Sequence, residues 1–145
     1  LAALKIKMNI VLKDPFEKGE RKKLNLGHTI GHALESVSIK NHGHLPHGCA
    51  VGIGILTESY LAVQKGFFPE KDFDALCDYL WPIYQSFLSL EFDNQELLKQ
   101  MKNDKKNIKQ AINFTFLKEI GHAVINQSAT DEEIVDALEW LKNKR

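Results

Sequence analysis

Two Gly-His pairs lie four residues apart in the segment LNLGHTIGHALE, residues 24–35. On an α-helix, side chains at positions i and i+4 project from the same face, about one turn apart. His28 and His32 would therefore face one small site, where two imidazoles could bind a metal ion or transfer protons. Gly27 and Gly31 each destabilise a helix by about 1 kcal/mol relative to alanine. Their presence indicates that a backbone or a ligand comes close.

A second group of histidines lies in NHGHLPHG, residues 41–48, which the asparagine, glycine and proline residues predict to be a loop. Imidazole ligands with an open coordination position suit a catalytic Zn²⁺ ion. A hydrogen-bonded core histidine is the alternative for any single member of the group. For His42 and His44, solvated loop residues are the simpler interpretation, and His47 remains a candidate ligand.

Charged side chains precede and follow these segments. Glu17 and Arg21 lie in a polar stretch before the first histidine pair, followed by Lys22 and Lys23. An arginine binds carboxylate or phosphate groups through two parallel hydrogen bonds, so Arg21 would suit an anionic substrate. The spacing alone does not distinguish that role from a solvated surface. Solvated surface is the simpler interpretation for Lys22, Lys23 and the NDKKN segment at 103–107.

Helices must position most of these residues. Apolar spacing predicts helices over 1–12 and from about Leu24 to Val37, and a long helix over 49–66 that ends at Gly66. Ala50 and Gly54 share one face of the long helix, where another backbone could approach closely.

The rest of the chain is also predicted to be mainly helical. Further helices are expected after Pro69, with Pro82 interrupting that helix, and from Asp93 to about Asn103. Short β-rich runs at 112–117 and 122–126 predict a small hairpin. Thr130 and Glu133 form a capping box for a last helix whose inner face carries Ile134, Leu138 and Leu141.

Composition predicts an ordinary globular domain. The 145 residues are 43% hydrophobic and 26% charged, with 19 basic and 19 acidic side chains. This balance favours neither a nucleic acid nor an anionic membrane as a partner. Cys49 and Cys77 form no CxxC pair, and no run of 18 apolar residues or signal-peptide cleavage site occurs, so a reducing cytoplasm is the expected compartment. Because Leu1 is not a methionine, we expect the chain to begin inside a larger protein.

With LPHGCAVGIGI following LNLGHTIGHALE, the sequence resembles the 3-dehydroquinate synthase family. Three further motifs carry the resemblance: a lysine in the first helix, Glu17-Lys18-Gly19-Glu20-Arg21, and MKNDKK at 101–106. The resemblance implies that residues 1–145 are the mainly helical C-terminal domain, which binds metal and substrate. It also implies a separate N-terminal domain that binds NAD⁺, and this chain contains no GxGxxG motif.

The resemblance further implies a set of site residues. His28 and His47 correspond to two of three protein ligands of a catalytic Zn²⁺ or Co²⁺ ion, the third being a glutamate of the N-terminal domain. His32 corresponds to a proton-handling residue rather than a ligand, in contrast to the interpretation of HxxxH as a ligand pair. The resemblance also implies that Glu17 takes part in proton transfer. Substrate carboxylate, hydroxyl or phosphate groups are implied to contact Lys7, Arg21, Asn25 and either Lys105 or Lys106.

The implied reaction converts 3-deoxy-D-arabino-heptulosonate 7-phosphate, a phosphorylated sugar acid, to 3-dehydroquinate and phosphate in the shikimate pathway. NAD⁺ would transiently oxidise a ring hydroxyl, phosphate would be eliminated, and the hydride would then return from NADH. The ring would open, and an intramolecular aldol step would close the carbocycle. The implied assembly is a homodimer. The isolated chain would be inactive, because it lacks the NAD⁺ site.

One position departs from the family pattern, because Cys49 stands where a glutamate is common. If that carboxylate orients a ligand histidine, cysteine would do so poorly, and metal affinity would fall. Cys49 as a thiolate ligand is a further alternative. Two other functions remain open: a related sugar phosphate cyclase or metal-dependent polyol dehydrogenase, and a non-catalytic helical metal-binding module.

Overall fold

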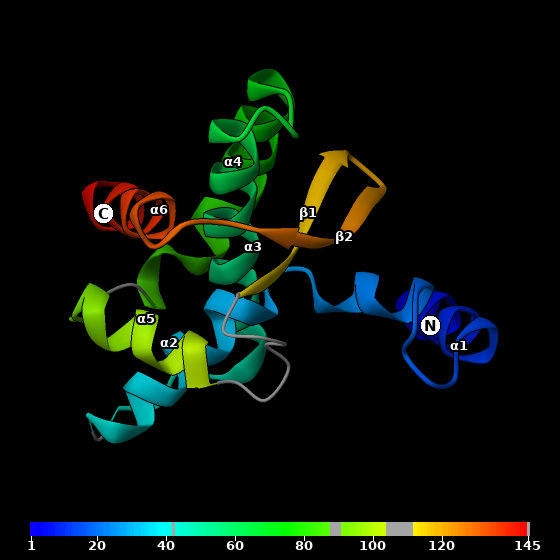
Figure 1. Ribbon diagram of the computed structural model, residues 1–145, viewed down its shortest axis with the longest axis horizontal. Coiled ribbons are helices and arrows are strands. Elements are labelled where there is room, and N and C mark those ends of the chain that lie inside the picture. Colours follow the sequence, from blue (N-terminus) through cyan, green and yellow to red (C-terminus); the bar gives the residue numbers. More distant parts are fainter. Residues whose placement is uncertain (42, 88–90, 104–111, 145) are drawn as a thin grey trace.

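The computed structural model describes residues 1–41, 43–87, 91–103 and 112–144. Its elements, in chain order, are α1 (Ala2–Lys13), the 3₁₀ helix η1 (Glu20–Asn25), α2 (His28–Lys40), α3 (His47–Gln64), α4 (Glu70–Tyr84), the 3₁₀ helix η2 (Gln85–Phe87), α5 (Asn94–Asn103), β1 (Asn113–Glu119), β2 (His122–Ser128) and α6 (Asp131–Asn143). Helix α3 runs through the middle of the helical body, with α2, α4 and α6 against it (Figure 1). The prediction of a mainly helical fold is confirmed.

The hydrophobic core surrounds α3. This helix is apolar on most of its surface and buries residues on several faces, as expected of a central helix. The hairpin of β1 and β2 pairs antiparallel, and β1 also packs against α3. The largest fully buried side chains come from α2, α3, α5, α6 and β1, and include Ile30, Ile53, Leu56, Leu97, Phe114, Phe116 and Leu138. The predicted hairpin is therefore confirmed, and β1 is part of the core.

Helices α2 and α3 approach each other closely because their contact is made of small residues. A Cβ atom on Gly54 would overlap the carbonyl oxygen of Gly27, and one on Gly31 would lie 2.9 Å from the carbonyl oxygen of Ala50. Real Cβ atoms essentially never come this close to backbone atoms, so larger side chains would push the helices apart. The predicted close approach at the face of Ala50 and Gly54 is confirmed, and its partner is α2.

The predicted start of the second helix was wrong. Leu24 and Asn25 belong to η1, and α2 begins only at His28. Gly27, between them, has φ of 76°, a left-handed conformation that other residues rarely adopt and that stops a continuous helix. Asn25 therefore does not lie on the same helix as His28.

The expected break at Pro82 was also wrong, since α4 continues to Tyr84. Proline removes one intrahelical hydrogen bond and favours a kink in a helix interior. Pro82 lies in the last turn of α4, where few bonds follow it. Pro69 occupies the position just before the first helical residue, and α5 begins at Asn94, within one residue of the prediction.

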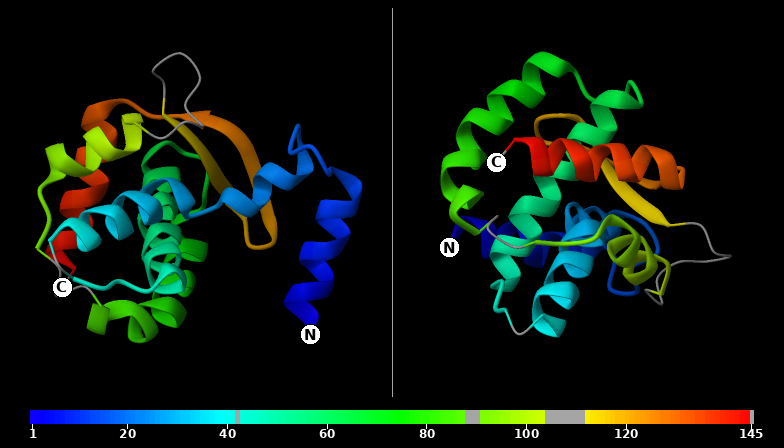
Figure 2. Two further views of the ribbon diagram at one scale, coloured as in Figure 1. Left: turned by 90° about the horizontal axis from the view of Figure 1, so that it is seen from below. Right: turned by 90° about the vertical axis from the view of Figure 1, so that its left-hand side faces the viewer.

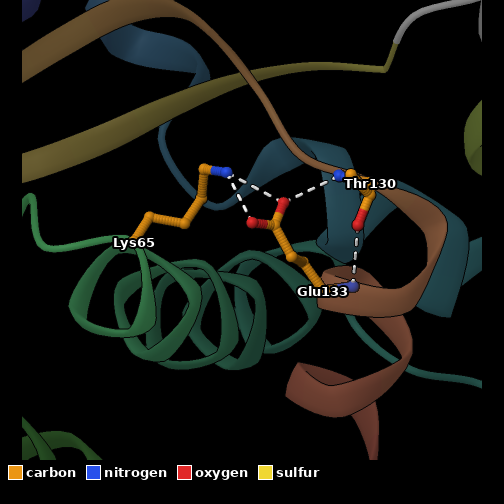
Figure 3. A network of polar contacts seen from close by, with 3 residues as sticks. All are labelled: Lys65, Thr130 and Glu133. Carbon is orange, nitrogen blue, oxygen red and sulfur yellow. Dashed lines mark hydrogen bonds and ion pairs between the residues drawn. The ribbon is translucent and has the colours of Figure 1, made fainter.

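A capping box begins α6, as predicted. The hydroxyl of Thr130 accepts a hydrogen bond from the Glu133 backbone N–H, and the Glu133 carboxylate accepts one from the Thr130 backbone N–H. Lys65, which directly follows α3, donates to both carboxylate oxygens of Glu133 at 2.8 Å (Figure 3). One carboxylate thus caps α6 and joins it to the end of α3.

Helix α1 stands apart from the helical body and packs mainly against η1 (Figure 2). None of its residues, all of which the structure describes, is buried. Apolar side chains that are more than half exposed include Leu4, Ile6, Met8 and Leu12. Within the described parts of the chain, no helix has the length and apolar character needed to cross a bilayer.

Candidate metal and substrate site

Three histidines meet where α2 and α3 begin. His28 is the first residue of α2, His32 lies one turn later, and His47 is the first residue of α3. Their ring centroids are 5.2 to 5.7 Å apart, and one nitrogen from each ring lies within 4.8 Å of the other two. Two nitrogens bound to one Zn²⁺ ion at about 2.0–2.1 Å lie no more than about 4.2 Å apart, so these imidazoles could ligate one ion after at most a small adjustment of the rings. The structure therefore brings together the two predicted ligands and His32.

A backbone carbonyl orients the ring of His28. Its Nδ1 atom lies 3.0 Å from the carbonyl oxygen of Leu26, which can only accept, so Nδ1 carries the proton. Nε2 is then the nitrogen that could bind a metal. Metal-binding histidines usually donate their other ring N–H to a carbonyl or a carboxylate in this way.

A carboxylate orients the ring of His47. Its Nδ1 atom lies 3.1 Å from Oε2 of Glu35, which lies on α2 three residues after His32. The same reasoning leaves Nε2 of His47 for a metal ion. Sequence reasoning missed Glu35, although it lies on the same helical face as His28 and His32, at spacings of seven and three residues. That spacing was a usable signal.

Cys49 packs against the hydrophobic core and does not belong to the histidine cluster. Because Glu35 bonds to His47, this chain has an orienting carboxylate despite the cysteine at position 49. The donor set fits a Zn²⁺ or Co²⁺ ion: the imidazoles converge, and two of them have hydrogen-bond acceptors that fix their tautomers.

A cavity of about 380 Å³ lies beside the histidine cluster, between α2 and α5. His32 and Glu35 line it from α2, and Gln100 and Asn103 line it from α5. The cavity therefore places polar groups next to the histidines, as a site for a polar small molecule requires. Lys105 and Lys106, which follow Asn103 by two and three residues, lie outside the described residues, as does His42.

The loop before η1 is organised by Asp14. Its carboxylate accepts hydrogen bonds from the backbone N–H groups of Lys18, Gly19 and Arg21 at 2.7 to 3.1 Å. Those bonds favour the charged form and lower the pKa of Asp14, led by the bond from Lys18. Glu17, inside this loop, adopts a left-handed conformation with φ of 55°.

The structure pairs two of the predicted site residues in this loop. The side-chain amide of Asn25 donates to Oε1 of Glu17 at 2.7 Å. Arg21 instead donates from Nη1 to the carbonyl oxygen of Pro15 at 2.9 Å. Within this chain, Glu17 and Asn25 therefore form one polar unit, and the Arg21 guanidinium is bound to its own loop.

The remaining basic candidates are at the surface. Lys7 is exposed on α1, and His44 is exposed in the loop before α3. Lys22 donates to the side chain of Asn126 at 3.3 Å, and Lys23 forms an ion pair with Glu20 at 2.8 Å. These contacts agree with the surface interpretation of Lys22 and Lys23.

A fully buried carboxyl group lies behind the first turn of α2. Glu58 of α3 accepts hydrogen bonds from the backbone N–H groups of Gly27 and Ile30, at 2.8 and 3.0 Å. Burial raises the pKa of Glu58 to about 8, and the hydrogen bonds from Ile30 and Gly27 oppose the rise. Sequence reasoning missed this residue, although it is the sole Asp, Glu, Lys or Arg in the segment 47–64.

Comparison with known proteins identifies relatives along almost the whole chain. Residues 1–107 match the family described as 3-dehydroquinate synthase C-terminal. The chain is 41% identical over 137 residues to a 3-dehydroquinate synthase of Parabacteroides distasonis, covering 94% of this chain and 39% of that protein. The chain is also 39% identical over 140 residues to the 3-dehydroquinate synthase of Halalkalibacterium halodurans, covering 95% of this chain and 37% of that protein. The chain thus spans about two fifths of these relatives.

Solved structures show the same fold at lower identity. A 2-epi-5-epi-valiolone synthase from Streptomyces hygroscopicus, with NAD⁺ and Zn²⁺ bound, superposes with a TM-score of 0.76 at 21% identity, covering 99% of this chain and 39% of that one. A 2-deoxy-scyllo-inosose synthase complexed with carbaglucose-6-phosphate, NAD⁺ and Co²⁺ gives a TM-score of 0.75 at 21% identity, covering 91% and 37%. The fold is thus that of the sugar phosphate cyclases, and the chain belongs to the 3-dehydroquinate synthase C-terminal family.

Proposed function

We propose that this chain is the metal- and substrate-binding domain of a 3-dehydroquinate synthase, acting with an N-terminal NAD⁺-binding domain. The enzyme would convert 3-deoxy-D-arabino-heptulosonate 7-phosphate to 3-dehydroquinate and phosphate in aromatic amino acid biosynthesis. The observation that carries the proposal is the convergence of His28, His32 and His47 beside a polar cavity. The identity to relatives with this activity supports the choice of reaction.

His28 and His47 would hold a Zn²⁺ or Co²⁺ ion through their Nε2 atoms. Leu26 and Glu35 support this assignment, because they engage the Nδ1 atom of each ring. The bound ion would act as a Lewis acid toward substrate oxygens. A glutamate of the N-terminal domain would complete the ligand set.

His32 would move protons rather than bind the metal. Its ring lies 5.2 Å from that of His28 and lines the cavity, so it can face both the ion and a bound substrate. Imidazole exchanges protons near neutral pH, as a residue that acts at several steps of one reaction must. Metal content distinguishes this role from that of a third ligand.

The substrate's anionic and hydroxyl groups would be bound by charged and polar residues that lie outside the described lining of the cavity. Arg21 and Lys7 would neutralise carboxylate or phosphate, together with Lys105 or Lys106. Glu17 would accept a proton, and its hydrogen bond with Asn25 would hold the carboxylate in position and present the amide to a hydroxyl. Because Arg21 is bound to its own loop, its role requires rearrangement or a neighbouring domain.

A related sugar phosphate cyclase is the second candidate, favoured by the fold shared with the valiolone and inosose synthases. It differs in substrate, so a panel of phosphorylated sugars would separate the two reactions.

For either enzyme we propose a cytoplasmic homodimer, with neither nucleic acid nor membrane as a partner. A purely structural metal module would instead bind zinc tightly without any further domain and release no phosphate.

Phosphate release by the full-length protein, with NAD⁺ and Zn²⁺, tests the proposal. Wild type should release phosphate from the heptulosonate phosphate. His28→Ala should lose both metal and turnover, and His32→Ala should lose turnover while keeping its metal. Inactive wild type, or full activity in both variants, would refute the proposed function.

A further inference from the structure

The first turn of α2 lacks a cap from its own sequence. The residue before the helix is Gly27, which has no side chain to accept a hydrogen bond from the first backbone N–H groups. A serine or asparagine could not replace it. A Cβ atom at this position would lie 2.5 Å from the Ile55 side chain and 2.6 Å from the Val51 carbonyl oxygen. Any cap for α2 must therefore come from elsewhere in the fold.

Glu58 provides that cap from α3. Its Oε1 atom accepts from the N–H of Ile30, the third residue of α2, and its Oε2 atom accepts from the N–H of Gly27, the residue before the helix. These are the same two backbone groups that a capping box satisfies. The carboxyl group also lies at the positive end of the helix dipole. One side chain therefore secures the turn on both sides of His28.

We propose that Glu58 is a positioning residue of the metal site, which fixes the first turn of α2 so that His28 and His47 can bind the same ion. The inference rests on the metal site of the proposed function. Helix α3 carries His47 at its first residue and Glu58 further along, so the bonds to Gly27 and Ile30 tie the helices of both ligands together. The close approach of Gly54 to Gly27 sets the distance between α3 and α2, and Glu58 sets the direction of the first turn of α2.

An apolar residue would fill the same volume without burying a carboxyl group. The side chain of Glu58 is fully buried, and its described hydrogen bonds go to the first turn of α2. Burying a carboxyl group without such bonds is strongly unfavourable. The choice of glutamate is thus explained by what it does for α2 and not by core packing.

Glu58→Gln removes one acceptor without changing the shape of the side chain. A carboxyl oxygen can accept a hydrogen bond whether or not the group carries a proton, whereas the amide nitrogen of glutamine only donates. One N–H group of α2 would therefore face another donor. The matched control is Thr57→Val, since Thr57 is equally buried on α3 but donates within its own helix, to the carbonyl oxygen of Ile53.

Co²⁺ binding by the full-length protein is the test, read as affinity and as the visible absorption spectrum of the bound ion. We expect Glu58→Gln to bind Co²⁺ at least about tenfold more weakly, with an altered spectrum, as for other residues that orient metal ligands. Thr57→Val should match the affinity and spectrum of wild type. A purely structural role would lower the unfolding temperature of Glu58→Gln and leave the spectrum unchanged.

Two outcomes are separable. If wild type binds Co²⁺ and folded Glu58→Gln binds it equally well with the same spectrum, the role of Glu58 is refuted and the metal site stands. If wild type itself binds no Co²⁺, the proposed metal site and this inference both fail. Should Glu58→Gln not fold, Glu58→Asp is measured instead. Aspartate is one methylene shorter than glutamate, so its carboxylate would not reach the N–H groups of α2. Wild-type affinity and spectrum in that variant would therefore also refute the role.

Discussion

The Glu35 carboxylate lies 3.1 Å from Nδ1 of His47, and this contact joins the middle of α2 to the first residue of α3. The acceptor that orients His47 therefore comes from a different helix, since Glu35 lies on α2. It also gives the chain an orienting carboxylate even though position 49 is a cysteine. The contact makes the ligand role of His47 dependent on a residue twelve positions earlier.

Glu35→Gln should weaken metal binding about 10- to 100-fold, because glutamine is a poorer acceptor for the Nδ1–H of His47. Equilibrium dialysis of the full-length protein with Zn²⁺ would measure the change. Glu119→Gln is the control, since Glu119 forms a similar exposed contact with His122, at 3.5 Å, away from the cluster. Equal affinity in wild type and Glu35→Gln would show that Glu35 does not support the ligand.

His32→Ala should lower kcat by about 10²- to 10⁴-fold, the range expected when a general acid or base is removed. The bound metal, measured by elemental analysis of the same samples, should stay stoichiometric. Loss of the metal in His32→Ala would assign His32 as a third ligand instead, since one nitrogen from each of the three rings lies within 4.8 Å of the other two.

Gly54→Ala should destabilise the fold by about 1–3 kcal/mol, the usual cost of overpacking, because its methyl group would overlap the Gly27 carbonyl oxygen. Urea unfolding would measure the change. Gly48→Ala is the matched control on the same helix: its methyl group would meet nothing within 4 Å. It should be neutral, or stabilise by up to about 1 kcal/mol through helix propensity. Equal stability of the two variants would refute the close approach of α2 and α3.

Stability should depend on pH through Glu58. Its pKa is raised by burial from an ordinary value of 4.5 to about 8, so the folded state binds more protons than the unfolded state between these values. The contribution of Glu58 to stability is therefore complete below about pH 4.5, falls by up to about 1.4 kcal/mol per pH unit as pH rises, and levels off above about pH 8. Glu58→Gln should remove this slope.

Urea unfolding of wild type and Glu58→Gln at intervals from pH 5 to pH 9 would measure this pH dependence. The free energy of unfolding of wild type should fall with rising pH relative to that of Glu58→Gln. Thr57→Val should retain the wild-type slope. If the free energy of unfolding of wild type rises with pH relative to that of Glu58→Gln, or if the difference between them stays constant, the raised pKa of Glu58 is contradicted.

Local patterns in the sequence determined most of the elements. The helices over the first residues, the long central helix, the hairpin and the last helix were all predicted, because periodic apolar residues, turn residues and caps act over a few positions. The capping box of Thr130 and Glu133 is of this kind, with both partners three residues apart. The one-turn spacing of His28 and His32 likewise placed both on one helical face.

Tertiary structure decided where the second helix begins and what supports the site. α2 starts at His28 because Gly27, pressed against α3, adopts a left-handed conformation. Its cap, Glu58, lies 28 and 31 residues from the groups it binds, and Glu35 reaches His47 across the same helix pair. The sequence by itself predicted the candidate ligands: helical spacing placed His28 and His32 on one face, and the family resemblance implied His28 and His47 as the pair that binds the metal. What holds them in place depends on contacts between segments far apart in the chain, which only the packing of α2 against α3 brings together.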